Sequence, residues 1–290
     1  MFKYKINQNG EIAITDYEGN DTEVIIPPEI EGKPVTSLGG TAFNGCTSLT
    51  DVNIPNSVTW IGDVAFRSCS SLTSVEIPDS VTSIGAYTFC GCNSLTSVEI
   101  PDSVKSIGIY AFYDCRNLTS VTIPDSVTNI RAYAFCGCSS LTRVEMPNSV
   151  TSIEAYAFSR CSSLKSITIP DSVKSIETCA FYNCRNLTSI TIPNSVTSIE
   201  MYAFCGCSSL TSITIPNNLI SIEVSVFGDC SSLTSVTIPE SVKSIMKHAF
   251  CGCYNLKDVW YSGTAEQWGK IAIDSYSRVL HKAKKHFKNA

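Results

Sequence analysis

Ten phenylalanines in this 290-residue chain follow one another at steps of 23 residues, from Phe43 to Phe250, and this spacing constrains the fold more than any other feature. Prolines keep the same step from Pro55 to Pro239. A fixed period of roughly 20 to 50 residues over most of a chain is typical of a solenoid. Each repeat then forms one coil and buries its apolar side chains only against neighbouring coils. We therefore predict about ten stacked 23-residue coils.

One repeat, residues 118–140, shows how a coil is built: it reads L-T-S-V-T-I-P-D-S-V-T-N-I-R-A-Y-A-F-C-G-C-S-S. Val121 and Ile123 alternate with polar residues, which predicts a short strand with one buried face. Pro124 ends that strand because proline has no N–H to donate to a ladder. The apolar pair Val127 and Ile130 predicts a second short extended segment. The repeat has no helical periodicity, so we expect little helix.

The two ends depart from the repeat and suggest three regions. Residues 1–23 contain two β-like runs around Asn9-Gly10, a strong hairpin signal, and predict an N-terminal β cap. Residues 24–261 carry the repeat and predict the solenoid. Residues 262–290 break the pattern and predict a C-terminal cap with a basic tail, in which Thr264 starts a short helix and Trp268 packs over the last coil.

Charge argues against nucleic acid as a partner. The chain carries a net charge of -5, and the residues before Lys257 hold 14 basic and 23 acidic side chains. A nucleic-acid-binding protein usually shows a basic stripe along its body, and this body is acidic. No run of 18 apolar residues is present, so we expect no membrane insertion. The N-terminus also lacks the apolar core of a signal peptide.

The pattern L-x-x-V-x-I-P-x-S-V-x-x-I-x-x-x-A-F-x-x-C resembles the BspA-type leucine-rich repeat over about residues 24–273. The resemblance implies a right-handed, β-rich solenoid of the leucine-rich repeat (α/β horseshoe) class. Proteins of this family are mostly bacterial or protozoan surface molecules, and some resemble adhesins that bind extracellular-matrix proteins. The resemblance thus implies a monomeric protein-binding module of the cell surface or a secreted one. With no signal peptide visible, a cytoplasmic interaction scaffold stays open as the alternative.

Cysteines follow the repeat as well. Ten of the fifteen form a column with the 23-residue step, from Cys46 to Cys253. Small thiols behave as compact hydrophobes when buried, so we predict a column of unpaired buried thiols. Disulfide frameworks show irregular, paired spacings instead. Four further cysteines form C-G-C tripeptides, which lie too far apart to supply the four ligands that zinc needs, and we predict no metal site.

Catalytic chemistry has little support in the sequence. The chain has three histidines, and His248 lies near Cys251 and Cys253, so a Cys–His nucleophile pair is the enzymatic alternative. No third residue that would orient such a pair is evident. Glu76 and Glu99 lie one coil apart, but paired carboxylates need an enclosed cleft to act as acid and base. We predict no enzyme, no catalytic residue and no cofactor.

The outward positions of the first strand are the best candidates for a binding surface. They are acidic in the N-terminal half, interrupted by Arg143, and rich in Ser and Thr in the C-terminal half. Short hydroxyl side chains suit weak, repeated contacts with an extended partner, although they can simply solvate a sheet or order water as in an ice-contacting array. Trp60, in another column, is either an exposed contact residue or packs on the N-terminal coil. The candidate protein-binding residues are Trp60, Glu76, Glu99, Arg143, Glu145, Thr168, Thr191, Thr214, Thr237 and Trp260.

A second acidic column follows the second extended segment. Like charges one coil apart repel modestly, so such a column has a cost in stability. We expect it either to attract a basic partner or to keep the chain in solution. Its members are Glu154, Glu177, Glu200 and Glu223.

Overall fold

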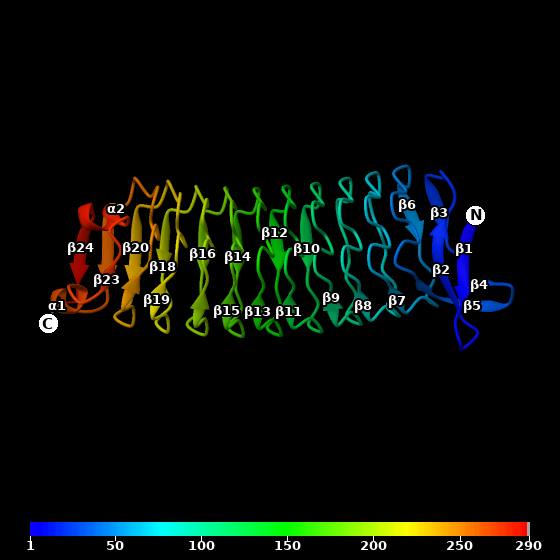
Figure 1. The fold of residues 1–290 in the computed structure, drawn as a ribbon, viewed down its shortest axis with the longest axis horizontal. Coiled ribbons are helices and arrows are strands. Elements are labelled where there is room, and N and C mark those ends of the chain that lie inside the picture. The colour runs from blue at the N-terminus through cyan, green and yellow to red at the C-terminus, as the bar shows by residue number, and fades with distance from the viewer. Residues whose placement is uncertain (289–290) are drawn as a thin grey trace. The chain divides into compact units, whose positions relative to one another are not determined.

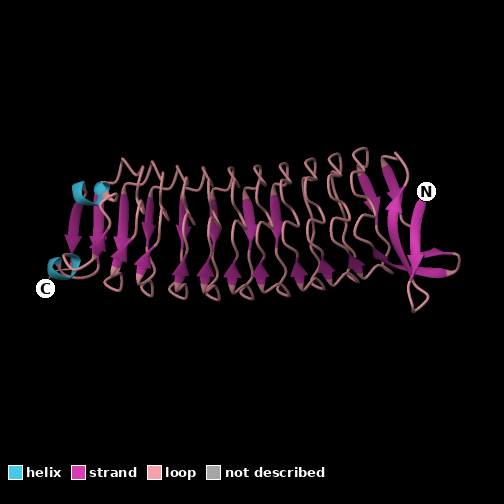
Figure 2. Ribbon diagram, viewed as in Figure 1, coloured by secondary structure: helices cyan, strands magenta, loops and turns pink. Residues whose placement is uncertain are grey.

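The computed structural model describes residues 1–288, and the chain forms two compact units, Met1–Ser149 (unit 1) and Val150–Ala290 (unit 2). Within each unit the chain runs through successive coils with the predicted 23-residue step, and strands and turns make up nearly all of it (Figure 2). The prediction of a solenoid of 23-residue coils with little helix is confirmed. The three-region division proposed from the sequence stays a prediction.

Unit 1 begins with the predicted hairpin (Figure 1). Strands β1 (Phe2–Ile6) and β2 (Ile12–Tyr17) pair in antiparallel fashion, and Gly10 has the left-handed φ of 78° that the turn between them requires. Strand β2 then pairs in parallel with β5 (Lys33–Leu38), while the short β4 (Glu29–Ile30) folds back on β5. The hairpin therefore covers the edge of the sheet formed by the second segments of the coils.

The coils of unit 1 contribute two columns of short parallel strands. Second segments extend the sheet from β5 in the order β7, β8, β9. First strands pair as β3 with β6 and as β10 with β12, and an isolated bridge joins Glu76 to Glu99 in the coils between. The first strands are β3 (Glu23–Ile25), β6 (Asp51–Asn53), β10 (Ser120–Thr122) and β12 (Arg143–Glu145); the second segments are β7 (Trp60–Ile61), β8 (Ser83–Ile84), β9 (Ser106–Ile107) and β11 (Asn129–Ile130).

Unit 2 repeats this arrangement. First strands pair in the orders β14-β16 and β18-β20-β22-β24, and second segments pair in the orders β13-β15-β17 and β19-β21-β23. The first strands are β14 (Ser166–Thr168), β16 (Ser189–Thr191), β18 (Ser212–Thr214), β20 (Ser235–Ile238), β22 (Asp258–Tyr261) and β24 (Lys284–Phe287); the second segments are β13 (Ser152–Ile153), β15 (Ser175–Ile176), β17 (Ser198–Ile199), β19 (Ser221–Ile222), β21 (Ser244–Ile245) and β23 (Ala272–Ile273).

The C-terminal region holds both helices of the described residues. Helix α1 (Ala265–Trp268) starts as predicted, with Thr264 and Gln267 forming a reciprocal capping box. Helix α2 (Arg278–Lys282) and strand β24 were not predicted from the sequence, which indicated only a basic tail; β24 pairs in parallel with β22 and lies along the edge of that sheet. Pairing orders this segment because it supplies backbone hydrogen bonds to an otherwise open strand.

Strand β24 places Lys285 opposite Val259, where the preceding coils of unit 2 carry Ile or Val. The Lys285 ammonium donates a hydrogen bond to the His281 carbonyl at 2.7 Å. Partial burial lowers the pKa of Lys285. The last strand of this sheet, β24, therefore carries the cation of Lys285 at a position where the preceding strands carry an apolar inward side chain.

Stacked phenylalanines form the centre of both cores. Rings in successive coils are almost parallel and fully buried, with centroids 5.1 to 5.4 Å apart from Phe43 to Phe135. The spacing is 5.3 to 5.7 Å from Phe158 to Phe250. Aromatic pairs contribute about 0.5–1.5 kcal/mol beyond the burial of their area. The 23-residue period therefore reflects the requirement that each ring meets its equivalent in the next coil.

Hydroxyl side chains make further ladders along the surface. Thr73 Oγ1 donates to the Thr50 carbonyl of the preceding coil at 3.1 Å, and Thr96 Oγ1 donates to Thr73 in the same way. After the proline turn, Ser103 Oγ donates to the Val81 carbonyl at 2.7 Å. The Thr50 and Thr73 carbonyls also accept the backbone N–H of the same threonines, so each hydroxyl adds a second bond between the coils. Many Ser and Thr residues of the repeat are thus structural.

In the A-F-x-x-C segment that closes each coil, successive N–H groups donate alternately to the next coil and to the same coil. The N–H of Phe66 donates to Thr88 of the next coil at 2.9 Å, whereas the N–H of Arg67 donates to Val64 three residues earlier. This alternation needs two left-handed residues per coil, for example Val64 with φ 56° and Ser68 with φ 61°. The second of these columns holds Gly45, Ser68, Gly91, Asp114, Gly137, Arg160, Asn183, Gly206, Asp229 and Gly252.

The glycines in this second left-handed column allow a matched test of backbone strain. Gly45 has φ 77° and open space where a Cβ would stand, whereas a Cβ on Gly252 would lie 2.9 Å from the Asp229 Cα. We expect Gly45→Ala to lower the free energy of unfolding by about 1 kcal/mol, from the left-handed conformation alone. Gly252→Ala should cost more, because backbone atoms must also move. Urea denaturation of both variants measures the difference; equal costs would contradict the packing argument.

Candidate functional site

The predicted outward positions of the first strands are exposed. Strands β10, β12, β14, β16 and β18 each show an exposed–buried–exposed pattern, with the central Val or Ile in the core. We call these exposed positions the strand face of each unit. Because burial and backbone bonding use the other positions, the strand face is where side chains can vary without cost to the fold.

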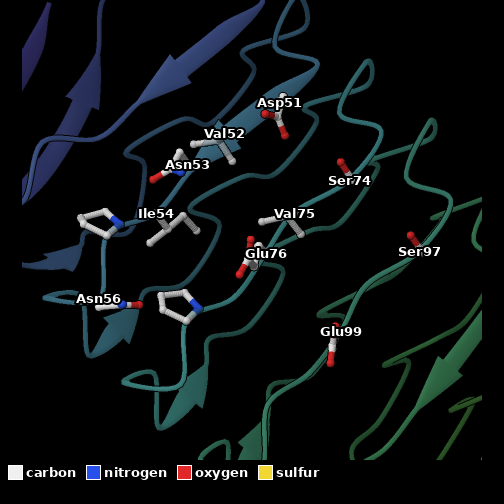
Figure 3. Close-up of a pocket in the computed structure, with 12 residues that line it drawn as sticks. Asp51, Val52, Asn53, Ile54, Asn56, Ser74, Val75, Glu76, Ser97 and Glu99 are labelled. Atoms are coloured by element: carbon white, nitrogen blue, oxygen red, sulfur yellow. The ribbon is translucent and has the colours of Figure 1, made fainter.

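In unit 1 the strand face contains a hollow of about 580 Å³, which we call the acidic hollow (Figure 3). Figure 3 shows Glu76 and Glu99 at equivalent places in neighbouring coils, with Ser74 and Ser97 beside them. The backbone bridge between Glu76 and Glu99 holds the two carboxylates one coil apart. The hollow is lined by Asp51, Val52, Asn53, Ile54, Pro55, Asn56, Ser74, Val75, Glu76, Pro78, Ser97 and Glu99.

Two of the candidate residues of unit 1 pair with each other outside this hollow. The Arg143 guanidinium forms an ion pair with the Glu145 carboxylate, and Thr122 Oγ1 donates to Glu145 at 3.2 Å. Both charged side chains are largely exposed, and such surface pairs contribute only about 0–1 kcal/mol. Arg143 therefore interrupts the acidic strand face locally, as the sequence suggested, and leaves the hollow anionic.

In unit 2 the strand face is neutral and hydroxyl-rich until its last strands. Thr168 lies opposite Thr191 in β14 and β16. Thr214, Thr237, Trp260 and then His286 follow one another across β18, β20, β22 and β24. The candidate threonines of unit 2 thus form rows across the strands, and the row with Thr214 and Thr237 ends at the aromatic side chains of Trp260 and His286.

Trp60 does not belong to either strand face. It lies in β7, whose pairing partner is Ser37 in β5, so it projects from the sheet of second segments. The side chain is 43% exposed, and its ring passes over Gly62. Trp60 thus leans on its own coil and keeps exposed apolar surface, apart from Glu76 and Glu99, and its role as a contact residue stays a prediction.

The second acidic column has a structural role. Glu177 Oε2 accepts a hydrogen bond from the Ala155 N–H at 3.0 Å, and Glu200 Oε2 accepts one from Thr178 Oγ1 at 3.2 Å. Burial raises the pKa of Glu177, the Ala155 bond opposes this rise, and the carboxylates of Glu154 and Glu200 reinforce it. These side chains complete turns of the preceding coil, so solubility is not their only role.

The cysteine column is buried, apart from the half-buried Cys46 in the first coil. Cys69, Cys92 and their counterparts donate S–H to the carbonyl of a column phenylalanine 26 residues earlier, for Cys69 at 3.0 Å. Burial raises the pKa of Cys69 to about 12. Thiols held this way are poor nucleophiles. The prediction of a buried thiol column holds for nine of its ten members.

No catalytic arrangement is evident around His248. Its ring lies against Tyr276, with centroids 4.7 Å apart, and Cys251 is exposed in the turn that follows. Over residues 1–288, no three His, Cys, Asp or Glu side chains gather as a metal ion would require. None of the helices in the same residues is long and apolar enough to cross a membrane.

One cluster escaped the sequence reasoning. His286 Nε2 lies 2.7 Å from Asp258 Oδ1, and the His286 ring stacks on Trp260 with centroids 3.9 Å apart. His286 lies outside the repeat, so only the pairing of β24 with β22 reveals its place. The one available signal was the departure of Trp260 from the Ser/Thr pattern of its column.

Thiol labelling tests the assignment of the cysteines. In the native protein near neutral pH we expect one fast-reacting thiol, Cys251, and slow reaction of the half-buried Cys46 and Cys90, whose pKa values are raised by burial. Cys251→Ser should remove the fast phase, whereas His248→Ala should leave its rate unchanged. A slower Cys251 in the His248→Ala variant would instead support the Cys–His hypothesis.

Glu177 provides a pH test. Its folded-state pKa is raised, so ionised Glu177 lowers stability at neutral pH, and this cost disappears as the pH falls below the unfolded value. We expect Glu177→Gln to raise the free energy of unfolding at pH 7 by up to about 1 kcal/mol and to have little effect near pH 4. Thermal unfolding at both pH values measures this; a gain confined to pH 4 would be contrary to it.

Comparison with known proteins identifies the family of the chain. The BspA type Leucine rich repeat region (6 copies) matches residues 20–142 and 128–257. A leucine rich cell surface protein from Faecalibacterium prausnitzii is 31% identical, with a TM-score of 0.54 and coverage of 94% of this chain and 96% of its own. A leucine-rich repeat protein from Bacteroides ovatus is 26% identical, with a TM-score of 0.67 and coverage of 99% and 98%.

A T. pallidum leucine rich repeat protein is 31% identical over 72% of this chain and 87% of its own, with a TM-score of 0.54. No curated protein sequence matches the chain. The repeat match spans well over half of the residues, and the folds of the related structures agree with the coils described above. The chain belongs to the BspA-type leucine-rich repeat family.

Proposed function

We propose that this chain is a non-catalytic protein-binding module that contacts a protein partner through its strand faces, in the manner of a cell-surface adhesin. The residues proposed to make these contacts are Glu76, Glu99, Arg143 and Glu145 in unit 1 and Thr168, Thr191, Thr214, Thr237 and Trp260 in unit 2. Trp60, which projects from the other sheet of unit 1, is proposed as a separate contact.

The observation that supports the proposal is that the inward and outward positions of each coil have different roles. Inward positions hold the same Leu, Ile, Phe and Cys in coil after coil, because each must stack on its equivalent. Outward positions of the strand face change from Asp and Glu to Arg, Ser, Thr and Trp. Sequence variation is concentrated where it does not disturb the stack, as expected of a rigid scaffold that presents a binding surface.

The acidic hollow favours a basic segment of the partner. Asp51, Glu76 and Glu99 line it, and no lysine or arginine is among its lining residues. A cationic partner segment would be attracted at long range, which raises the association rate more than the final affinity. The hydroxyl rows of unit 2 add hydrogen-bonding groups with little side-chain entropy to lose. Affinity in this scheme comes from many weak contacts.

Two further points support the adhesin hypothesis. The similarity to a cell surface protein from Faecalibacterium prausnitzii favours a location at the surface, where extracellular-matrix or other surface proteins would be the partners that we propose. The geometry favours binding over catalysis, because Glu76 and Glu99 are exposed on an open face and His248 contacts a tyrosine ring. An intracellular scaffold would use the same surfaces.

Capture by a panel of immobilised extracellular-matrix proteins tests the proposal. We expect binding by at least one of them that weakens in about 0.5 M salt, and a loss of roughly tenfold in affinity for the double variant Glu76→Gln/Glu99→Gln. The matched control Glu200→Gln/Glu223→Gln removes the same charge from the second acidic column and should bind normally. Absence of capture, or equal loss in both variants, would reject the acidic hollow as the contact.

A further inference from the structure

Two adjoining hollows lie near the C-terminal end of unit 2 and share Ser262 and Lys288. The first, of about 440 Å³, lies beside strands β20, β22 and β24. The second, of about 570 Å³, continues toward the turns before β19 and β21. The first is lined by Thr237, Trp260, Tyr261, Ser262, His286, Phe287 and Lys288, the second by Asn217, Pro239, Glu240, Ser241, Lys243, Ser262 and Lys288.

An exposed aromatic surface forms one wall of the first hollow. Trp260 is 50% exposed although its ring stacks on His286 at an interplanar angle of 13°. His286 Nε2 also contacts Asp258 Oδ1, two residues before Trp260 in β22, and this contact fixes the imidazole. Phe287 packs edge-on against Tyr261, the next register pair, so these two rings project to the opposite side of the strands from Trp260 and line the hollow at the strand ends. A ring held in place on one side and open to solvent on the other is pre-organised to stack against a ligand.

Polar groups surround this wall. Thr237, Ser262 and Ser241 offer hydroxyls and Asn217 an amide, and these groups can donate and accept hydrogen bonds. Lys288 and Lys243 supply cations, and the Lys243 ammonium donates to the Glu240 backbone carbonyl at 2.9 Å. Glu240 is the one carboxylate in the lining of the second hollow. From Lys257 onward the chain holds seven basic and three acidic residues, so the surrounding field is positive.

We propose that this groove, the pair of hollows joined at Ser262 and Lys288, binds an anionic saccharide chain carrying carboxylate or sulfate groups. The Trp260 ring would stack on the C–H face of a sugar, the hydroxyls and Asn217 would bond its hydroxyl groups, and Lys243 and Lys288 would pair with its anions. Each of these three lining chemistries matches a part of an acidic sugar.

An acidic peptide fits less well. Extended peptides gain most of their affinity by adding a strand to an open sheet edge through backbone hydrogen bonds. The groove is lined by side chains of β20, β22 and β24 and of the turns beside them, whereas strand addition would use the backbone of the terminal strand β24. The proposed ligand also differs from the protein partner of the strand faces, although Trp260 is common to both.

Isothermal titration of the full chain with a sulfated glycosaminoglycan oligosaccharide tests the proposal, with a neutral glucan of equal length and poly-glutamate as comparison probes. We expect the sulfated saccharide to bind at least about tenfold more tightly than either comparison probe. Trp260→Ala should weaken binding by about tenfold, and Trp260→Phe should recover part of it, because a ring is restored. Lys243→Ala/Lys288→Ala should reduce both the affinity and its salt dependence.

Matched controls separate the groove from general effects. Trp60→Ala removes a similarly exposed tryptophan from unit 1 and should leave saccharide binding unchanged. Circular dichroism identifies any variant that fails to fold. For such a variant, the test is instead the chemical-shift perturbation of the tryptophan indoles when the saccharide is added to the unaltered chain. Equal binding of poly-glutamate, binding unaffected by Trp260→Ala, or no saccharide binding would each overturn the proposal. Because Lys243 and Lys288 lie outside the strand face, their variants should leave matrix-protein capture intact.

Discussion

The structure depends on one constraint: every inward side chain must meet its own equivalent one coil further on. This explains why phenylalanine rings stack nearly parallel, why thiols line up beneath them, and why hydroxyls donate to carbonyls of the preceding coil. The strands of the coils are only two to four residues long, but backbone bonds between coils continue in the closing segments, as from the Phe66 N–H to the Thr88 carbonyl. Side-chain ladders add to these bonds, and the fold can then leave one face of each strand free.

The period and the alternation were sufficient to predict the strands, the buried columns and the exposed strand face. They were insufficient for the closing segment, where the left-handed column alternates Gly45 and Gly91 with Ser68 and Asp114. Glycine, aspartate and asparagine recurring there were the available signal, since these residues tolerate positive φ best. Helix α2 and strand β24 were missed because they lie outside the repeat and take their order from pairing with a neighbouring coil.

The sequence indicated which candidate side chains are exposed, but not which of them lie together in the structure. Periodicity tells which side of a strand a residue occupies, so Glu76, Glu99 and the threonine rows are found where expected. It cannot tell that His286 stacks on Trp260, because His286 lies outside the repeat. For acidic side chains such as Glu177 the sequence suggested either a basic partner or a role in solubility, whereas in the structure the Glu177 carboxylate accepts a hydrogen bond from the preceding coil.

Lys285 has a consequence for how the molecule behaves in a crowded solution. Parallel strands of identical register invite further chains to add at an open edge, and a head-to-tail contact that does not close on itself grows into fibres. On β24 the inward position opposite Val259 carries an ammonium held by the His281 carbonyl. Any strand docking there would have to bury that charge without a counter-ion. An inward cation on β24 therefore disfavours the addition of another strand beside it.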